Sequence, residues 1–287
     1  MAVSNITAKQ VYKSCKGNDI WAYVLLDTVK ELPPSHRTVP HVPDEDIQLL
    51  LHQFADVFSD PQKIPPQRSY DHAIPLMPDV VPINSRHYHY SPEHKTEIEN
   101  QVKQLLEQGL ITHSNSPFAS PVPLVKKKDG TWRFCVAYRK LNAITIKNKF
   151  PIPIIEEILD ELQGSKVFTK LDMRSGYHQV RMLPNDEHKI AFKTHQSHYQ
   201  FKVMPFGLTN APATFQCIMN QVLQPFLRHF VLVFLDDILI YSSSMGDHIQ
   251  HLQQVLETLR AHQLYLKASK CTFAQNSLEY LGHIISA

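Results

Sequence analysis

Apolar residues recur along this chain at two spacings, and each spacing predicts one type of element. Positions three or four residues apart indicate amphipathic helices, and they occur at residues 46–58, 91–109, 154–164, 210–222 and 249–259. Short runs rich in apolar and β-branched residues indicate strands, and they occur at 131–138, 166–171, 178–182, 199–203, 230–234, 238–241 and 278–285. Mixed helices and short strands predict an α+β protein with antiparallel pairing.

Cap residues and prolines refine this picture. Ser91 is expected to cap a helix that has Pro92 in its first turn, and Gly109 is expected to end that helix. Eleven of the twenty prolines fall at or before Pro92. Residues 1–76 are therefore expected to form an extended, loop-rich leader that contains one helix.

Two adjacent carboxylates lie inside an apolar run. The sequence FLDDILIYS places Asp236 and Asp237 between two short strands that would meet in a tight turn around Leu235. Because burying an unpaired carboxylate costs several kcal/mol or more, such a pair needs an explanation. The stretch alone fits two: a plain hairpin turn, in which Asp is common, or a tip that holds a hard divalent cation.

A third acid favours the metal site. Asp172 ends the predicted strand 166–171, in the sequence VFTKLDMRSGYHQV. A carboxylate at the end of one strand, beside a hairpin that carries two more, can build a two-metal site. Such a site clamps the attacking and leaving oxygens of a phosphoryl transfer.

The net charge of +2 does not by itself indicate a nucleic-acid partner, but the charge distribution does. Residues 121–150 contain eight Lys or Arg and one acid, Asp129, and aromatic residues interleave with these charges. A phosphate backbone could lie there, with salt-dependent affinity. The alternative is a solvated basic face.

Other classes of protein are disfavoured. The four cysteines lie far apart without a CxxC spacing, which predicts a reducing compartment and neither a zinc site nor a disulfide framework. No apolar run approaches the roughly 18 residues of a membrane span. The first residues, MAVSNITAKQVYKS, lack the apolar core of a signal peptide, so we expect cytoplasmic synthesis.

Several long motifs, in one order, give the chain a family resemblance. They are the two acidic stretches above, MPFGLTNAPATFQ at 204–216, SPFASPVPLVKKKDGTWRF at 116–134, YRKLN at 138–142, NKFPIP at 148–153 and YLGHIIS at 280–286. Together they resemble the reverse transcriptase of gypsy-type LTR retrotransposons, over roughly residues 54–286. The resemblance implies a right-hand polymerase fold with an antiparallel palm sheet and packed helices. It places the leader at 1–76, where the family has a connector between protease and polymerase, the fingers at 77–146 and 180–210, and the palm at 147–179 and 211–287.

The implied function is RNA-directed DNA polymerase activity. Asp172, Asp236 and Asp237 would be the catalytic acids and the ligands of two Mg²⁺ ions, with Mn²⁺ as an alternative. The partners would be dNTPs and an RNA or DNA template with its primer, and no membrane. Homo-oligomerisation and assembly with other retrotransposon proteins stay open, as do the cytoplasm, a virus-like particle and the nucleus as locations.

The resemblance also implies nucleotide contacts. Lys127 and Arg133 would hold the triphosphate, Tyr177 would block a 2′-hydroxyl, and Phe206 with Gly207 would support the nascent base pair. Lys270 would protonate the leaving pyrophosphate. From the residues alone, Tyr177 is rather a core aromatic and the KKKDG stretch a solvated turn.

Nucleic-acid contacts are implied at five further residues. They are Lys126, Lys128, Arg139, Leu281 and Gly282, the last two resembling the primer grip, although 280–285 could equally be a core strand.

Two departures from the family keep a second hypothesis open. Ala137 stands where the family has an aspartate, and the chain stops at Ala287, directly after the primer-grip strand, so we expect the thumb to be missing. The second hypothesis is a catalytically weak or inactive retrotransposon remnant that serves as a nucleic-acid-binding module or a structural subunit.

Overall fold

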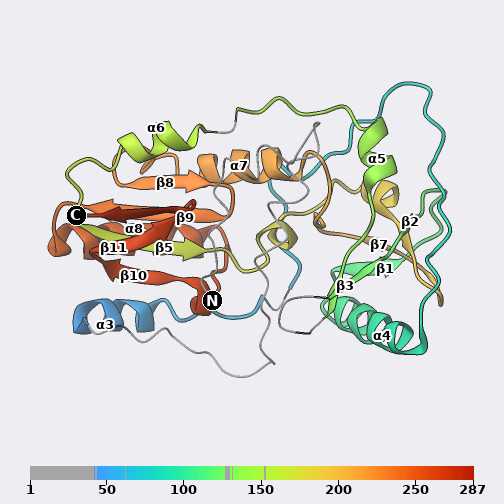
Figure 1. The fold of residues 1–287 in the computed structure, drawn as a ribbon, viewed down its shortest axis with the longest axis horizontal. Coiled ribbons are helices and arrows are strands. Elements are labelled where there is room, and N and C mark those ends of the chain that lie inside the picture. The colour runs from blue at the N-terminus through green and yellow to red at the C-terminus, as the bar shows by residue number, and fades with distance from the viewer. Residues whose placement is uncertain (1–41, 43, 62, 127–129, 131, 152) are drawn as a thin grey trace, which may run out of the picture.

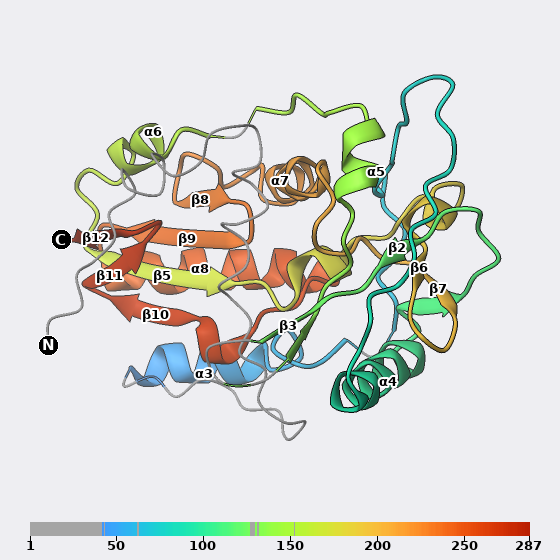
Figure 2. The same cartoon turned by 45° about the vertical axis from the view of Figure 1, so that its right-hand side comes forward.

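The computed structural model describes residues 42, 44–61, 63–126, 130, 132–151 and 153–287, and these residues form two lobes (Figure 1). One lobe contains a four-stranded sheet between helices, and the other contains the helix α4 and a second four-stranded sheet with shorter strands. The two lobes also lie side by side in the view turned by 45° (Figure 2). No helix among these described residues is long and apolar enough to cross a membrane.

The sheet of the first lobe is antiparallel throughout, with strand order β10-β5-β9-β8. Its strands are β5 (Val167–Asp172), β8 (Val231–Phe234), β9 (Asp237–Ser242) and β10 (Thr272–Gln275). The register pairs Asp172 with Asp237 at one end of the sheet. The arrow of β5 points toward the second lobe, so this end of the sheet faces the space between the lobes (Figure 1).

Both faces of this sheet are covered, because its strands are apolar on both sides. The helices α7 (Ala211–Val222) and α8 (Met245–Ala261) pack against one face, and α3 (Glu45–Gln53) packs on α8. The other face is covered by α6 (Ile155–Asp160) and by the hairpin of β11 (Ser277–Tyr280) and β12 (His283–Ser286). Since strand residues alternate between faces, Asp172 and Asp237 lie on the side of the β11–β12 hairpin.

A buried histidine joins α8 to the sheet. His248 is fully buried, and its ring nitrogens lie 2.6 Å from the Thr169 Oγ1 on β5 and 2.9 Å from the Ser242 Oγ on β9. Burial lowers the pKa of His248 to about 4, and His251 nearby acts in the same direction. The neutral imidazole of α8 therefore forms hydrogen bonds to both β5 and β9 and links the helix to the two strands.

The second lobe is built around a sheet of order β1-β7-β6-β2. The helix α4 (Pro92–Glu107) and the short helix α5 (Arg139–Ile144) flank it (Figure 1). A separate hairpin joins β3 to β4. The strands are β1 (Ile111–His113), β2 (Ser120–Pro121), β3 (Leu124–Lys126), β4 (Trp132–Phe134), β6 (Phe192–Lys193) and β7 (His198–Phe201).

The helices agree well with the sequence pattern. Ser91 caps α4 by accepting a hydrogen bond from the His94 N–H, and Pro92 opens the helix as expected. The predicted helix at 154–164 is shorter, as α6, and the one at 46–58 ends its regular turns at Gln53. Predicted α7 and α8 are present, although α8 begins four residues earlier than its apolar stripe, at a Ser244 cap.

Three strand predictions need correction. Residues 178–182 do not form a strand, because Gly176–Gln179 is a 3-10 helix and only isolated bridges follow at Arg181 and Met182. Residues 278–285 form two strands, since Leu281 and Gly282 take positive φ angles and turn the chain into a hairpin. The strand expected at 131–138 is shorter and comprises only β4, Trp132–Phe134. Tyr138 comes directly before the helix α5.

The leader is less extended than its prolines suggested. Its described part contributes α3 and a set of buried side chains to the main hydrophobic core: Val42, Ile47, Leu50, Leu51, Phe54, Val57, Phe58 and Ile74. The Arg260 guanidinium of α8 lies 4.1 Å from the Phe54 ring centre and pairs with Asp56. This segment is therefore part of the folded unit.

Candidate active site

The β8–β9 turn places two acids at the end of the sheet, as the sequence predicted. Leu235 takes a positive φ of 55° and is buried, and Asp236 follows it before β9 begins at Asp237. A left-handed conformation is unfavourable for a branched residue such as Leu235. It persists only where the surroundings hold the turn.

Gln216 on α7 holds this turn. Its side chain is fully buried, its Oε1 accepts a hydrogen bond from the Leu235 N–H at 2.7 Å, and its Nε2 donates to the Val233 carbonyl oxygen at 3.1 Å. The same Nε2 donates to the Asn220 Oδ1 at 2.8 Å. One amide therefore fixes both the last part of β8 and the turn that presents Asp236.

Asp172 completes a group of three carboxylates. Burial raises the pKa of Asp172 to about 6; Lys270 opposes this shift, and the negative charges of Asp236 and Asp237 add to it. Burial also raises the pKa of Asp236, with the charge of Asp237 acting in the same direction. The three acids predicted from separate stretches therefore lie close enough to influence one another, which is typical of functional sites.

Two lysines neutralise part of this negative charge. The Lys270 Nζ lies 3.2 Å from the Asp172 Oδ2, and the Lys170 Nζ lies 3.0 Å from the Asp237 Oδ1. Lys270 is brought to the site by the 3-10 helix Ala268–Lys270, whereas Lys170 is on β5 itself. Lys270 was among the predicted site residues, and Lys170 was not.

The acids suit a hard cation in their chemistry. The Asp172 Oδ1 is a buried oxygen that has no hydrogen-bond partner among the described residues, so it offers a free ligand position. Carboxylate oxygens are the ligands that Mg²⁺ and Mn²⁺ prefer. In the geometry of the described residues, however, no three His, Cys, Asp or Glu side chains are arranged to hold one ion together. The donor set fits a divalent ion, and the lysines pair with the Asp172 Oδ2 and the Asp237 Oδ1, which leaves the Asp172 Oδ1 for the ion.

Tyr177 lies beside the acids within an aromatic cluster. Its ring centre is 4.9 Å from that of Phe206 and 5.5 Å from that of Phe215. A Cβ on Gly176 would meet the Phe215 ring at 2.9 Å, so only glycine allows this approach. Burial, and then the charge of Asp236, raise the pKa of the Tyr177 hydroxyl.

The cluster brings together residues predicted separately. Tyr177 is almost fully buried, whereas Phe206 is 37% exposed and covers it toward the solvent. Gly207 beside it takes a φ of 94°, and its carbonyl oxygen accepts a hydrogen bond from the Asn142 amide. Phe206 and Tyr177 are therefore in contact, close enough to Asp236 for its charge to act on the Tyr177 hydroxyl, whereas Gly207 contacts Asn142 on α5.

Two of the other predicted residues, Arg133 and Arg139, lie in the second lobe. Arg133 is on β4, opposite Val125, and Lys126 approaches the Trp132 ring centre to 5.8 Å. Arg139 is exposed at the start of α5. Lys127 and Lys128 lie outside the described residues.

The predicted primer-grip residues form the tip of the β11–β12 hairpin. Leu281 and Gly282 make its turn, and the neighbouring Ile284 is 81% exposed, the most exposed large apolar side chain among the described residues. Tyr280, just before the turn, donates a hydrogen bond to the Asp237 carbonyl oxygen at 3.4 Å. The hairpin is therefore attached to the acid turn.

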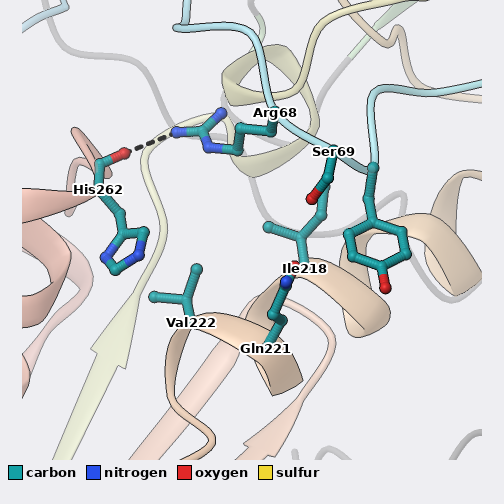
Figure 3. Close-up of a pocket in the computed structure, with 7 residues that line it drawn as sticks. Arg68, Ser69, Ile218, Gln221, Val222 and His262 are labelled. Atoms are coloured by element: carbon teal, nitrogen blue, oxygen red, sulfur yellow. Dashed lines mark hydrogen bonds between the residues drawn. The ribbon is translucent and has the colours of Figure 1, made fainter.

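A separate pocket of about 380 Å³ lies on another part of the first lobe (Figure 3). Its lining residues are Arg68, Ser69, Tyr70, Ile218, Gln221, Val222 and His262. Arg68 spans the region, donating to the carbonyl oxygens of Gln179 at 2.7 Å and His262 at 2.8 Å. None of the predicted site residues lines this pocket.

Comparisons with known proteins identify a family. A family model described as "Reverse transcriptase (RNA-dependent DNA polymerase)" matches residues 125–285. The chain is 38% identical over 269 residues to the retrovirus-related Pol polyprotein from transposon 297 of Drosophila melanogaster, covering 91% of this chain and 25% of that protein. It is 34% identical over 250 residues to the transposon Tf2-3 polyprotein of Schizosaccharomyces pombe, covering 86% of this chain and 18% of that protein. The chain thus spans a quarter or less of the length of these relatives.

Solved structures show the same fold. The foamy viral protease-reverse transcriptase in complex with an RNA/DNA hybrid matches with a TM-score of 0.77 and 21% identity, over 86% of this chain and 34% of that one. The selenomethionine-labelled CSH mutant of the prototype foamy virus protease-reverse transcriptase matches with a TM-score of 0.76 and 24% identity, over 88% of this chain and 34% of that one. The expected α+β polymerase fold is confirmed, with an antiparallel sheet in the first lobe and one parallel pair, β2 with β6, in the second.

Proposed function

This chain belongs to the reverse transcriptase (RNA-dependent DNA polymerase) family, and from that premise we propose that it forms the fingers and palm of an RNA-directed DNA polymerase of a retrotransposon. The reaction would add deoxynucleotides to the 3′-hydroxyl of a primer. The first lobe would be the palm, at 147–179 and 211–287, and the second lobe the fingers, at 77–146 and 180–210. The observation that carries the proposal is the convergence of Asp172 with the β8–β9 acids at the end of the sheet.

Divalent metal ions are used generally in this family, and the acids here suit them. We propose that Asp172 and Asp236, with Asp237 as the third acid, hold two Mg²⁺ ions, with Mn²⁺ as an alternative. When bound, such ions lower the pKa of a primer hydroxyl and neutralise the triphosphate. The buried Asp172 Oδ1 and the raised pKa values of Asp172 and Asp236 support this assignment, since a bound cation would favour the ionised form of both.

The chain's other residues would bind and orient the substrates. Lys270 would give a proton to the leaving pyrophosphate, and its ion pair with Asp172 at 3.2 Å supports this role. Phe206, partly exposed over Tyr177, would support the nascent base pair with Gly207, and Tyr177 would set the space for the sugar. Arg133 on β4 would hold the triphosphate together with Lys127, which follows β3 in the sequence.

The nucleic-acid partner would lie along the basic block of the second lobe and the tip of the β11–β12 hairpin. Lys126, Lys128 and Arg139 would contact phosphates, and Leu281 with Gly282 would hold the primer end. Two solved relatives in fold are titled as complexes with an RNA/DNA hybrid and with double-stranded DNA.

Primer extension tests the proposal directly. The chain is given a labelled primer on an RNA or a DNA template, the four dNTPs and Mg²⁺ or Mn²⁺, and product length is measured. We expect extension that EDTA stops, and its loss in Asp172→Asn and in Asp236→Asn with unchanged folding by circular dichroism. Asp237→Asn should be milder. Near-normal extension by either of the first two variants would refute the metal assignment.

One observation favours the second hypothesis, a remnant that binds nucleic acid without extending it. Lys170 and Lys270 already pair with two of the three acids, and the described residues provide no preassembled three-ligand metal site. Tight binding to a primer–template with no extension in either metal would support that hypothesis. It would leave the fold assignment unchanged.

A further inference from the structure

Lys170 is a charged residue in the middle of a buried strand. It precedes Asp172 by two positions on β5 and therefore lies on the same face of the sheet. The neighbouring residue on that face, Phe168, is buried in the apolar cluster beneath the β11–β12 hairpin. A partly buried ammonium group in such surroundings is costly unless it is paired.

Lys170 is paired on two sides. Its Nζ lies 3.0 Å from the Asp237 Oδ1, and the side chains of this pair are 24% and 28% exposed. The pair is diagonal across β5 and β9, because the register opposes Lys170 to Leu239 and Asp172 to Asp237. The same Nζ lies 6.0 Å from the centre of the Tyr280 ring, within range of a cation–π interaction.

Tyr280 contacts both members of the Lys170–Asp237 pair. It is fully buried on β11, and its hydroxyl donates to the Asp237 carbonyl oxygen at 3.4 Å. Asp237 is thus held at its carboxylate by Lys170 and at its backbone by Tyr280, while Lys170 and Tyr280 contact each other. Three elements, β5, β9 and the β11–β12 hairpin, meet at this one residue.

We propose that Lys170 is a positioning residue, which fixes the Asp237 carboxylate and fastens the acid turn to the β11–β12 hairpin. This inference rests on the proposed function, in which the hairpin holds the primer end and the turn holds the ions. Lys170 touches neither nucleotide nor ion in this role. Its effect is to keep the distance between the primer end and the acids constant.

A double-mutant cycle tests the link without requiring activity. Thermal unfolding is measured in EDTA for Lys170→Met, for Asp237→Asn and for the double variant, with Lys166→Met as the control, an exposed lysine just before β5. We expect each single variant to lower the midpoint by roughly 2–6 °C. The double variant should lose no more than the worse single variant, because removing both partners leaves no unpaired charge. Losses that add fully would overturn the proposal.

Primer extension then separates positioning from mere stability. Lys170→Met should lower kcat by roughly ten- to a hundredfold, as expected for a displacement of about 1 Å at the reacting groups, while KM for the dNTP stays within about twofold. Lys170→Arg, which keeps the charge, should restore most of the rate, and Lys166→Met should match the wild type. If Lys170→Met folds poorly, Lys170→Gln provides the same comparison.

The two proposals fail in different ways. A wild-type chain without extension would count against the proposed function, and the unfolding cycle would still decide whether Lys170 holds Asp237. An active wild type whose Lys170→Met variant keeps its kcat, or whose Lys170→Arg variant is as damaged as Lys170→Met, would overturn the positioning role alone.

Discussion

The hydrogen bonds of Gln216 give the sharpest test of how the acid turn is held. Replacing Gln216 by Leu keeps the side-chain volume near its original value and removes both the acceptor for the Leu235 N–H and the donor to the Val233 carbonyl. Leu235 and Val233 are buried, so water cannot easily replace the lost partners. The substitution therefore isolates the polar contribution of one amide.

The expected loss of stability follows from the two groups left unpaired. Each buried backbone group without a partner costs about 1–3 kcal/mol, and the gain of an apolar side chain offsets part of this cost. We expect a net loss of about 2–4 kcal/mol in the free energy of unfolding, which lowers the thermal midpoint by roughly 5–15 °C. Because Leu235 is held at a positive φ, the turn should also relax toward a more common conformation.

The assay combines unfolding with primer extension below the midpoint of the variant. Extension should fall by roughly a hundredfold if the Asp236 carboxylate moves by about 1 Å. Gln221→Leu is the matched control, since Gln221 lies on the same helix but is exposed beside the pocket. If Gln216→Leu unfolds and extends like the wild type, Gln216 does not hold the turn and the reasoning is wrong.

Three further predictions address other parts of the molecule. Tyr177→Ala should raise incorporation of rNTPs relative to dNTPs by opening space beside Phe206, and an unchanged ratio would make Tyr177 a packing residue only. Replacing Lys126, Lys127 and Lys128 together by Ala should flatten the slope of log K for primer–template binding against log salt by up to roughly two or three units; equal slopes would place the nucleic acid elsewhere. Stability should fall as the pH drops from about 6.5 toward 4, because His248 is kept neutral in the folded state with a pKa of about 4 while the unfolded chain takes up its proton. The cost from this residue approaches about 3 kcal/mol, at 1.36 kcal/mol for each tenfold difference in proton affinity. His248→Gln should reduce the pH dependence measured by urea unfolding, and an unaltered pH profile would contradict this account.

The sequence pattern was sufficient where local spacing determines the structure. The stripe and the Ser91 cap located α4, and the apolar runs around Asp236 located both strands of the acid hairpin. The pattern failed at residues 178–182, where Gly176 and the packing of Tyr177 on Phe215 favour a 3-10 turn. It also failed at Leu281, where a branched residue takes a positive φ that no local propensity predicts.

The sequence singled out the three acids but not the residues that hold them in position. Asp172, Asp236 and Asp237 stand out because carboxylates are rare in apolar runs. Gln216 stands within a predicted helix and Lys170 within a predicted strand, and nothing nearby in sequence identifies their partners. Gln216 reaches residues 17 and 19 positions away, and Lys170 reaches Asp237 on another strand. Such pairs are a product of the fold and become visible only with it.

The packing of the leader onto the first lobe has a consequence for dissecting this polypeptide. The family match begins at residue 125, yet the Leu266 N–H donates to the Val57 carbonyl oxygen, Phe58 packs edge-on against Phe273, and Arg174 pairs with Asp60. The region that the family model matches is thus smaller than the region whose side chains pack together. A chain that begins at residue 77, without the leader, would expose the apolar side of α8 that α3 covers. Such a chain should aggregate or be degraded on expression. A chain that begins near residue 42 retains that cover, so we expect it to be expressed as a folded protein.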